Sequence, residues 1–417
     1  MCPGEEDLKC GDVEMSGKKR IMIIAHFCDY GKENSNNRFN YLANLLVTSG
    51  YDVELVTSSF SHRDKKQREE TAVGAYKTTL IYEPSYSKNI SLKRLFVSHR
   101  IMADNLKKYL ESAEKPDLIY CAIPSINVSE VAAKYAEVNK VPFFIDVQDL
   151  WPEAYKFILK HESVYRLATK SMQKRVDRVY AAADQVIAVS ETYAERAMRV
   201  NNKCRESLAV YLGTELVAFD RNVHGNEPLV KKNEGEFWVG YCGTLGHSYD
   251  LSIVMYALQK LRAQGIENVR FIVIGSGPLE EQFKSLANEL GVNCIFTGKL
   301  PYEKMCAQLC ECDIAVNPIA KGAAQSIINK HGDYAMAGLP VVSTQENSEY
   351  RNLLSEYGCG ISCAPDSVDD VCEALKRICS DEFNRKMMSE SSRRLAEDRF
   401  DRAKAYKKIL MTMEGLL

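Results

Sequence analysis

The chain has 417 residues, which is too long for one ordinary hydrophobic core and predicts two domains. Its 54 basic residues are balanced by 56 acidic ones, so the overall charge does not favour a nucleic-acid-binding protein. No apolar run approaches the ~18 residues that a membrane-spanning helix needs. Residues 1–18 start with an acidic segment and lack the apolar core of a signal peptide, and we expect them to form a disordered leader.

Residues 19–212 have the pattern of a first α/β domain. The continuous apolar run 21–25 is typical of a buried strand, and a polar loop, a helical pattern from Arg38 and a second strand at 52–57 follow it. This β-α-β order predicts a parallel sheet. Further strands are predicted at 117–121, 141–146 and 185–190, and further helices at 127–139 and 192–200.

Residues 213–235 contain Asn, Gly, Pro and charges with little periodic apolar pattern, and we interpret them as a linker. Residues 236–398 then repeat the alternation of strands and helices. The predicted fold class is therefore α/β, with two doubly wound parallel-sheet domains. Residues 399–417 predict a long helix without a following strand, which we expect to pack back towards the first domain. The strands predicted in the second domain are 237–242, 270–274, 293–296, 313–317 and 340–343, and its helices include 250–263 and 278–290.

The fourteen cysteines do not indicate disulfides or a metal. Four of them lie within or beside apolar runs, as small buried residues do. The only cluster, Cys306, Cys310 and Cys312, lacks the paired Cys-x-x-Cys spacing of a zinc site. We therefore expect no metal centre and a reducing compartment, the cytosol.

The segment 329–343 combines a charged helix start with an apolar strand. Lys330 and Asp333 are three residues apart, so they share one face near the N-terminus of a helix that Gly338 ends. A helix start beside a lysine favours a phosphate, and the acid can accept hydrogen bonds from sugar hydroxyls. This pattern predicts a phosphate-and-ribose site; the alternative is a surface helix with an ordinary ion pair.

Two glycine turns follow predicted strands of the second domain. Gly243 and Gly246 let backbone N–H groups approach a diphosphate, and His247 can add a donor; a tight turn without a ligand is equally compatible with this pattern. The second turn, Gly275 and Gly277, lacks the third glycine of the dinucleotide fingerprint, because Glu280 stands there. The sequence therefore gives little support to a dehydrogenase.

Two loops of the first domain carry further candidates. The loop around Gly31, ending in Arg38, suits a clamp for a diphosphate or an acceptor, with a solvated surface loop as the alternative. Asp149, Trp151 and Glu153 follow the strand 141–146 and combine carboxylates with an apolar platform, as many sugar sites do. Asp149 is our candidate for orienting or deprotonating the acceptor, and the alternative is a structural Trp-Pro corner.

With these motifs in order, the chain resembles the family-4 glycosyltransferases, which have the GT-B fold of two facing Rossmann-like domains with an interdomain cleft. The nearest type is the bacterial enzymes of capsule, O-antigen and exopolysaccharide assembly. The resemblance covers roughly residues 19–415. It rests on the segments 38–39, 148–153, 241–246, 273–278, 329–330 and 338–341.

The resemblance implies a reaction and its partners. It implies transfer from a nucleotide-sugar donor, which family frequency suggests is UDP-linked, to a saccharide or polyprenyl-linked acceptor in cell-surface polysaccharide biosynthesis. It also implies retention of anomeric configuration without a bound metal or other cofactor. Such an enzyme is expected to be cytoplasmic, at the inner face of the plasma membrane where its acceptor is lipid-linked.

The resemblance carries residue roles onto matching positions. Asp333 matches the second, ribose-binding acid of the family's E-x7-E pattern, and Lys330 matches a lysine beside the donor phosphates. Gly243 and Thr244 match the loop that faces the diphosphate. The first acid of the pattern is replaced by Gln325, which can still bind sugar hydroxyls but offers no carboxylate.

Two other features leave alternatives open. Basic and apolar residues interleave over 88–108, which is typical either of a helix lying on anionic lipid or of a charged helix packed on the sheet. The function has two rivals as well. One is a non-hydrolysing sugar-nucleotide epimerase, for which Asp149, Glu153 and His26 are the available acid–base groups. The other is a non-catalytic nucleotide-sugar-binding partner of a transferase.

Overall fold

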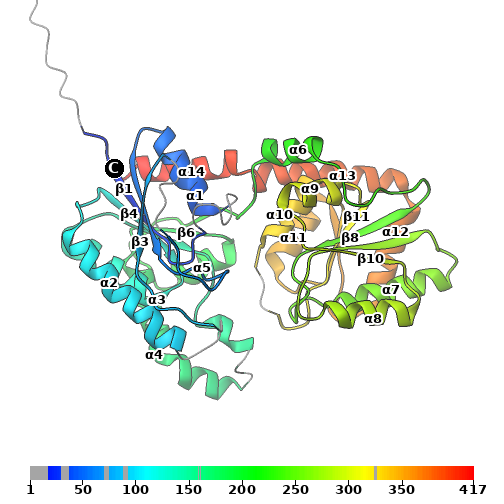
Figure 1. Cartoon of the computed structure of the whole chain (residues 1–417), viewed down its shortest axis with the longest axis horizontal. Helices are drawn as coiled ribbons and strands as arrows, with labels where there is room; N and C mark the ends of the chain where they lie inside the picture. Colours follow the sequence, from blue (N-terminus) through cyan, green and yellow to red (C-terminus); the bar gives the residue numbers. More distant parts are fainter. Residues whose placement is uncertain are drawn as a thin grey trace, which may run out of the picture.

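The computed structural model describes residues 17–29, 37–69, 75–87, 93–157, 159, 161–323 and 326–417. Most of the predicted leader therefore lies outside the described residues. The chain forms two α/β domains that lie side by side, each built on one parallel sheet with helices on both faces (Figure 1). Among the helices in these ranges, none is long and apolar enough to cross a membrane.

The first domain is a seven-stranded parallel sheet in the order β3-β2-β1-β4-β5-β6-β7. Its central strands are apolar on both faces because helices cover both: α1 and α14 pack on one face, and α2, α3 and α4 pack on the other. The strands are β1 (Arg20–Ile24), β2 (Asp52–Ser58), β3 (Lys77–Ile81), β4 (Leu118–Ile123), β5 (Phe143–Val147), β6 (Gln185–Ala188) and β7 (Leu208–Ala209). The helices are α1 (Arg38–Thr48), η1 (Lys93–Ser98), α2 (His99–Ser112), α3 (Ile126–Asn139), η2 (Glu153–Phe157), α4 (Glu162–Ala182) and α5 (Glu191–Met198).

The second domain is a six-stranded parallel sheet in the order β10-β9-β8-β11-β12-β13. Helices α7, α8 and α12 share a core with one face, and α9, α10 and α11 share a core with the other. The strands are β8 (Phe237–Cys242), β9 (Val269–Ile274), β10 (Cys294–Gly298), β11 (Ile314–Asn317), β12 (Val341–Ser343) and β13 (Gly360–Ser362). The helices are α6 (Leu216–Gly225), α7 (Leu251–Ala263), α8 (Glu280–Leu290), α9 (Tyr302–Cys310), α10 (Asn329–Met336), α11 (Ser348–Tyr357), α12 (Val368–Ser380), α13 (Glu382–Leu395) and η3 (Ala396–Phe400). The last helix, α14 (Arg402–Glu414), returns to the first domain.

The two sheets repeat one topology. Counted along the chain from β1 or from β8, the first six strands of each domain lie in the same spatial order, 3-2-1-4-5-6. In such sheets the strand order reverses beside the first strand, and ligands bind outside the carboxyl ends of the strands at that switch point. The loops after β1 and after β8 are therefore the equivalent positions at which a ligand is expected.

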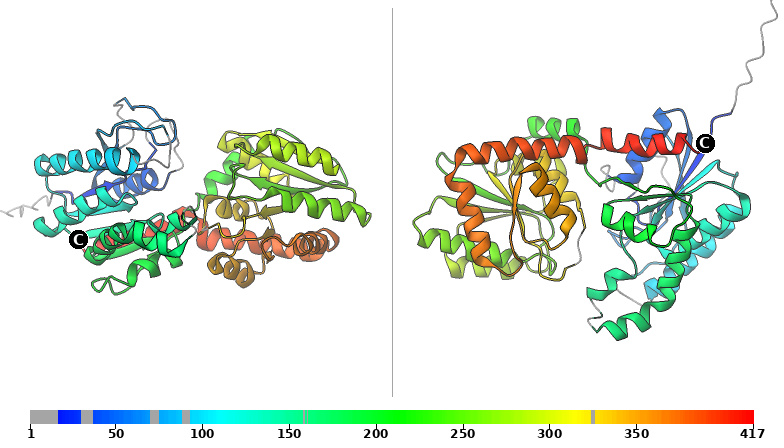
Figure 2. Two further views of the ribbon diagram at one scale, coloured as in Figure 1. Left: turned by 90° about the horizontal axis from the view of Figure 1, so that it is seen from below. Right: turned by 180° about the vertical axis from the view of Figure 1, so that it is seen from behind.

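Every predicted strand forms within two residues of its expected bounds, and two further elements need comment. The interpreted linker, 213–235, contains the helix α6, whose Phe219 is buried in the core that α9 and α10 share. The chain then crosses between the domains a second time near Phe400, whose carbonyl accepts a 3.0 Å hydrogen bond from Thr214 N. Beyond this crossing α14 lies on the first domain, where Tyr406 and Ile409 are buried (Figure 2).

Candidate functional site

The switch point of the second domain is a glycine turn that lies over a lysine. Gly243 follows β8 directly and has a φ of 143°, a backbone conformation that side chains disfavour. Its N–H donates to Ile274 O at 2.9 Å, which fixes the turn to the neighbouring strand. A Cβ on Gly243 would lie 2.9 Å from Lys330 Nζ, so only a glycine lets this backbone approach the ammonium group.

The second glycine turn holds the first one in place. A Cβ on Gly275 would lie 1.9 Å from Gly243 O, and a Cβ on Gly277 would lie 2.3 Å from Leu245 O. Leu245 N also donates to Ser276 O at 3.0 Å. These glycines are therefore explained by close contact between two backbones, which agrees with the incomplete dinucleotide fingerprint.

Lys330 is a buried cation without a counterion. It lies in the first turn of α10, is 7% exposed, and its Nζ has no hydrogen-bond partner within the described part of the chain. The ammonium lies 4.2 Å from the ring centre of Tyr241 and 3.7 Å from that of Tyr249. Burial lowers the pKa of Lys330 from 10.5 to about 7. Cation–π contacts alone leave its three N–H groups unsatisfied, so the site is built for an anion.

Asp333 lies one turn further along α10 but does not pair with Lys330. Its Oδ1 accepts a 2.9 Å hydrogen bond from Tyr302 OH, and that hydroxyl oxygen lies 3.2 Å from Thr214 Oγ1. Burial raises the pKa of Asp333 to about 6. All residues of α10 from Lys330 to Met336 are buried, so the alternative of a surface helix with an ordinary ion pair is wrong.

The structure gives less support to the other residues predicted to bind the donor. Thr244 and His247 are exposed on the glycine turn that carries Gly243. Gln325 and Gly31 lie outside the described residues. Arg38 is fully buried and does not support the predicted donor role: its Nε donates to Asp146 Oδ2 at 2.6 Å and its Nη1 to Val210 O at 2.7 Å. It is a core ion pair that ties α1 to β5.

The switch point of the first domain carries a histidine instead of a glycine turn. His26 follows β1, is fully buried, and lies with its Nε2 2.8 Å from Glu83 Oε2. Ser58 and Ser98 hydroxyls donate to the same carboxylate. Burial alone would raise the pKa of Glu83, but the His26 ring and these hydrogen bonds outweigh it and lower the pKa to about 2.

An arginine lies among three aromatic rings beside this pair. The Arg94 guanidinium is 5.0 Å from the ring centre of Phe27, 5.5 Å from that of Tyr86 and 5.3 Å from that of Trp151. Arg94 is 7% exposed, so at least one cation of the basic segment 88–108 points into the protein, which favours the alternative of a helix packed on the domain. The Arg94 Nε also donates to His99 Nε2 at 3.2 Å.

Asp149 and Trp151 lie together at this edge of the sheet, as predicted. Asp149 accepts hydrogen bonds from Leu150 N at 2.9 Å and from Trp151 Nε1 at 3.1 Å. Burial raises the pKa of Asp149, which makes its carboxylate a better proton acceptor. The predicted acceptor residue Glu153 is held elsewhere, because its Oε1 accepts a 2.5 Å hydrogen bond from Arg196 Nε.

The carboxyl ends of the two sheets approach each other at Glu349. Glu349, at the start of α11, accepts hydrogen bonds from Glu191 N at 2.7 Å and Thr192 N at 3.1 Å, at the start of α5. Because α5 follows β6 and α11 follows β12, this carboxylate caps a helix of the opposite domain where both strands end.

The sequence predicts no metal centre, and one cluster of side chains in the structure bears on this prediction. In the described ranges, His26, Glu83 and His99 are the one cluster of three metal-ligating side chains. Their geometry fits hydrogen bonding better than a cation, because His26 is paired with Glu83 and His99 Nε2 accepts from the positively charged Arg94. From the sequence, His26 is named only as an acid–base candidate of the rival epimerase, and its partner Glu83 lies outside the elements that the sequence pattern indicated.

Glycosyltransferase models match both domains of the chain. The model of glycosyltransferase family 4 matches residues 36–209, and the model of glycosyl transferases group 1 matches residues 227–395. An uncharacterized glycosyltransferase of Methanocaldococcus jannaschii is 23% identical over 242 residues, which are 57% of this chain and 60% of that protein.

Solved structures share the fold over nearly the whole chain. Sucrose-phosphate synthase from Thermosynechococcus elongatus has a TM-score of 0.70 at 16% identity, covering 96% of this chain and 99% of its own. HepE from Anabaena in complex with UDP has a TM-score of 0.65 at 15% identity, covering 95% and 100%. WaaG, a glycosyltransferase involved in lipopolysaccharide biosynthesis, has a TM-score of 0.62 at 15% identity, covering 93% and 98%. One glycosyltransferase model therefore matches each domain, and the chain has the GT-B fold of two parallel-sheet α/β domains.

Proposed function

We propose that this glycosyltransferase moves a sugar from a UDP-linked donor to a saccharide or polyprenyl-linked acceptor in cell-surface polysaccharide biosynthesis, with retention of anomeric configuration. The glycosyltransferase models that match both domains support nucleotide-sugar transfer. HepE, which has the same fold, binds UDP and UDP-glucose. The lipopolysaccharide pathway of WaaG supports the choice of acceptor class. Nuclear magnetic resonance of the product's anomeric proton tests retention.

The observation that carries the proposal is the unpaired ammonium of Lys330 under the Gly243 turn. A diphosphate bound there supplies the paired countercharge that Lys330 lacks among the described residues, and glycine leaves room for its oxygens. Asp333, on the same helix, accepts hydrogen bonds from the ribose hydroxyls with the oxygen that Tyr302 does not occupy.

The proposed chemistry places the leaving group and the nucleophile on opposite domains. As the glycosidic bond breaks, negative charge develops on the diphosphate, and Lys330 stabilises it most strongly because the site is shielded from water. The sugar passes through an oxocarbenium-like state and the acceptor hydroxyl attacks from the same face. Asp149 orients that hydroxyl and takes its proton, alone or with the departing phosphate. Because Lys330 supplies the positive charge, we expect transfer to persist after treatment with a metal chelator.

The rival epimerase requires several acid–base groups at the reacting sugar. His26 is fully buried against Glu83, and Glu153 is paired with Arg196. Of the three candidate groups, Asp149 alone remains for proton transfer. One such group suits an acceptor-activating base better than an epimerase.

We place membrane contact on α4 in preference to residues 88–108. Helix α4 exposes Leu167 (80% exposed) beside the solvent-facing cations Arg166, Lys170 and Lys174. Apolar and basic groups on one exposed helix suit the surface of an anionic membrane, where the acceptor lipid is found. Co-sedimentation with phosphatidylglycerol vesicles at low salt should fall in the variant Lys170→Glu/Lys174→Glu and stay unchanged in Lys304→Glu, on the second domain. Equal sedimentation of all three proteins would reject this surface.

The donor site is tested by replacing the buried ammonium with an apolar side chain of similar length. Lys330→Met should weaken UDP binding by about 100-fold in titration calorimetry, because a shielded charge interaction is lost. Lys304→Met, an exposed lysine of the same domain, should bind like the wild type. UDP bound equally by Lys330→Met would contradict the proposed site.

A further inference from the structure

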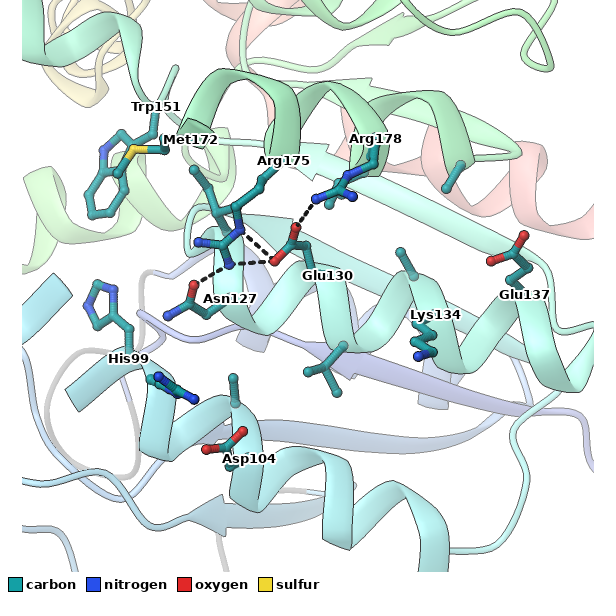
Figure 3. A pocket seen from close by; sticks show the side chains of 17 residues that line it. His99, Asp104, Asn127, Glu130, Lys134, Glu137, Trp151, Met172, Arg175 and Arg178 are labelled. Atoms are coloured by element: carbon teal, nitrogen blue, oxygen red, sulfur yellow. Dashed lines mark hydrogen bonds and ion pairs between the residues drawn. The ribbon is translucent and has the colours of Figure 1, made fainter. Parts of the chain in front are cut away.

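A long groove runs along the helical layer of the first domain. Its volume is about 730 Å³, and it lies between α2 and α4 with α3 as its floor (Figure 3). The floor is apolar, formed by Ile126, Val131 and Ala133 of α3, and Ala103 and Met172 contribute to the walls. We refer to it below as the helical groove.

One end of the helical groove reaches the acceptor-side edge of the sheet. Trp151, Met172 and His99 lie at that end, and Glu137 lies at the other (Figure 3). From Asn127 to Glu137 the floor helix rises ~15 Å. Trp151 lines the groove and also donates its indole N–H to Asp149, so the groove begins beside the proposed acceptor-activating carboxylate.

Where α3 meets α4, the charged side chains of the groove are paired with one another. Glu130 pairs with both Arg175 and Arg178, and Arg175 also donates to Asn127 Oδ1. These ion pairs join α3 to α4 (Figure 3). The groove is also lined by Arg100, Asp104, Lys134 and Glu137, and the alkyl groups of the floor lie among these charges.

We propose that the helical groove binds the hydrocarbon chain of a lipid-linked acceptor, with the acceptor's reacting sugar at Asp149 and the chain lying along α3. The proposal rests on the proposed transfer function and defines its acceptor as a molecule with a linear apolar tail. The apolar floor matches such a tail, and the shared residue Trp151 makes the groove continuous with the acceptor end.

The indole of Trp151 provides a direct measurement, because the chain has two tryptophans and the other, Trp238, is 1% exposed in the second domain. Isopentenyl, geranyl and farnesyl phosphates would be titrated against tryptophan fluorescence, with inorganic phosphate as the head-group control and maltoheptaose as a glycan. We expect affinity to rise by about fourfold for each methylene-sized group inserted. The signal should disappear in Trp151→Phe.

Matched variants locate the bound chain. Val131→Glu puts a charge on the groove floor and should abolish the dependence of affinity on chain length, whereas Val138→Glu, on the same helix outside the groove, should retain it. Ala133→Phe fills the groove without adding charge and should act like Val131→Glu, and thermal melting confirms that each variant is folded.

Several results would overturn the proposal: equal binding of farnesyl and inorganic phosphate, quenching by maltoheptaose in place of farnesyl phosphate, or chain-length dependence that survives in both folded groove variants. The proposed function fails separately. Farnesyl phosphate binding by a protein that binds no nucleotide sugar would leave the groove intact and reject transfer, whereas transfer to soluble acceptors without chain-length dependence would reject the groove alone.

Discussion

The two domains share one strand order but place opposite electrostatics at their switch points. After β8 the chain makes a glycine turn over Lys330, a buried cation that lacks a hydrogen-bond partner in the described residues. After β1 stands His26, whose Nε2 is paired with a hydrogen-bonded Glu83. Within the described residues, one switch point lacks a paired countercharge and the other has one. Under the proposed function, this difference favours the second domain for the anionic donor and the aromatic edge of the first domain for the neutral acceptor sugar.

The buried charge of Lys330 lowers the stability of the folded protein. Charging Lys330 in the folded protein costs free energy, because burial lowers its pKa from 10.5 to about 7. The cost, of order 5 kcal/mol, is fully present below pH ~7 and disappears as the pH rises towards 10.5. A protein retains such a group when a ligand offsets its cost.

The largest effect should come from closing the donor turn. Gly243→Ala places a Cβ 2.9 Å from Lys330 Nζ at a φ of 143°, so either the lysine or the turn must move. UDP affinity should fall by more than about 100-fold in calorimetry. Gly246→Ala is the matched control, since its Cβ would meet only Thr244 Cγ2, at 3.7 Å. If both variants bind UDP normally, the turn does not face the diphosphate.

At the other switch point, replacing the carboxylate should affect folding and leave the donor alone. Glu83→Gln should lower the free energy of unfolding by about 3 kcal/mol at pH 7, because the pKa of Glu83 is about 2 instead of 4.5. The stabilising contribution is present above pH ~4.5 and is lost as the pH falls towards 2, so the two proteins should converge in acid denaturation. UDP affinity should not change. Glu111→Gln, at an exposed carboxylate, serves as the control. A large loss of UDP affinity in Glu83→Gln would contradict the placement of donor binding in the second domain alone.

A smaller effect, on catalysis alone, is expected at the acceptor edge. Asp149→Asn should slow transfer by about 100-fold while UDP affinity stays unchanged, because the amide cannot take a proton. Glu153→Gln should keep its transfer rate and lose stability, because Glu153 is paired with Arg196. Rates of transfer and of donor hydrolysis measure both. Near-normal transfer by Asp149→Asn would remove it from the mechanism, and slow transfer by a stable Glu153→Gln would restore the predicted acceptor role of Glu153.

Ten of the thirteen strands in the described residues, and the place of Lys330 on a helix, were predictable because their signals are local, whereas β3, β7 and β13 were not predicted. Continuous apolar runs indicate buried parallel strands, and the spacing of Lys330 and Asp333 on one helix indicates a shared face. The sequence could not show that these two side chains diverge, with Asp333 bonded to Tyr302 and Lys330 placed among tyrosine rings. That outcome depends on packing between distant segments.

The sequence was a poor guide to the roles of Arg38 and Arg94 for the same reason. Arg38 opens a helix beside a polar loop, which suggests a ligand, yet its partner Asp146 lies on β5 and is distant in sequence. Arg94 belongs to a basic segment that resembles a lipid-facing helix, but aromatic rings from three separate segments surround its guanidinium. A charged residue's exposure is decided by tertiary partners that local patterns do not contain.

The most direct test of the account is proton uptake when UDP binds. Because Lys330 has a pKa of about 7, it is mostly neutral at pH 8, and a bound diphosphate should raise its pKa and draw in about one proton. Above pH ~7 the affinity should therefore fall by up to about tenfold per pH unit. Calorimetry at pH 8 in buffers of different ionisation enthalpy should give about one proton per UDP for the wild type and none for Lys330→Met. Binding of UDP by the wild type without proton uptake, or with the same uptake in Lys330→Met, would contradict the assignment of the donor diphosphate to this lysine.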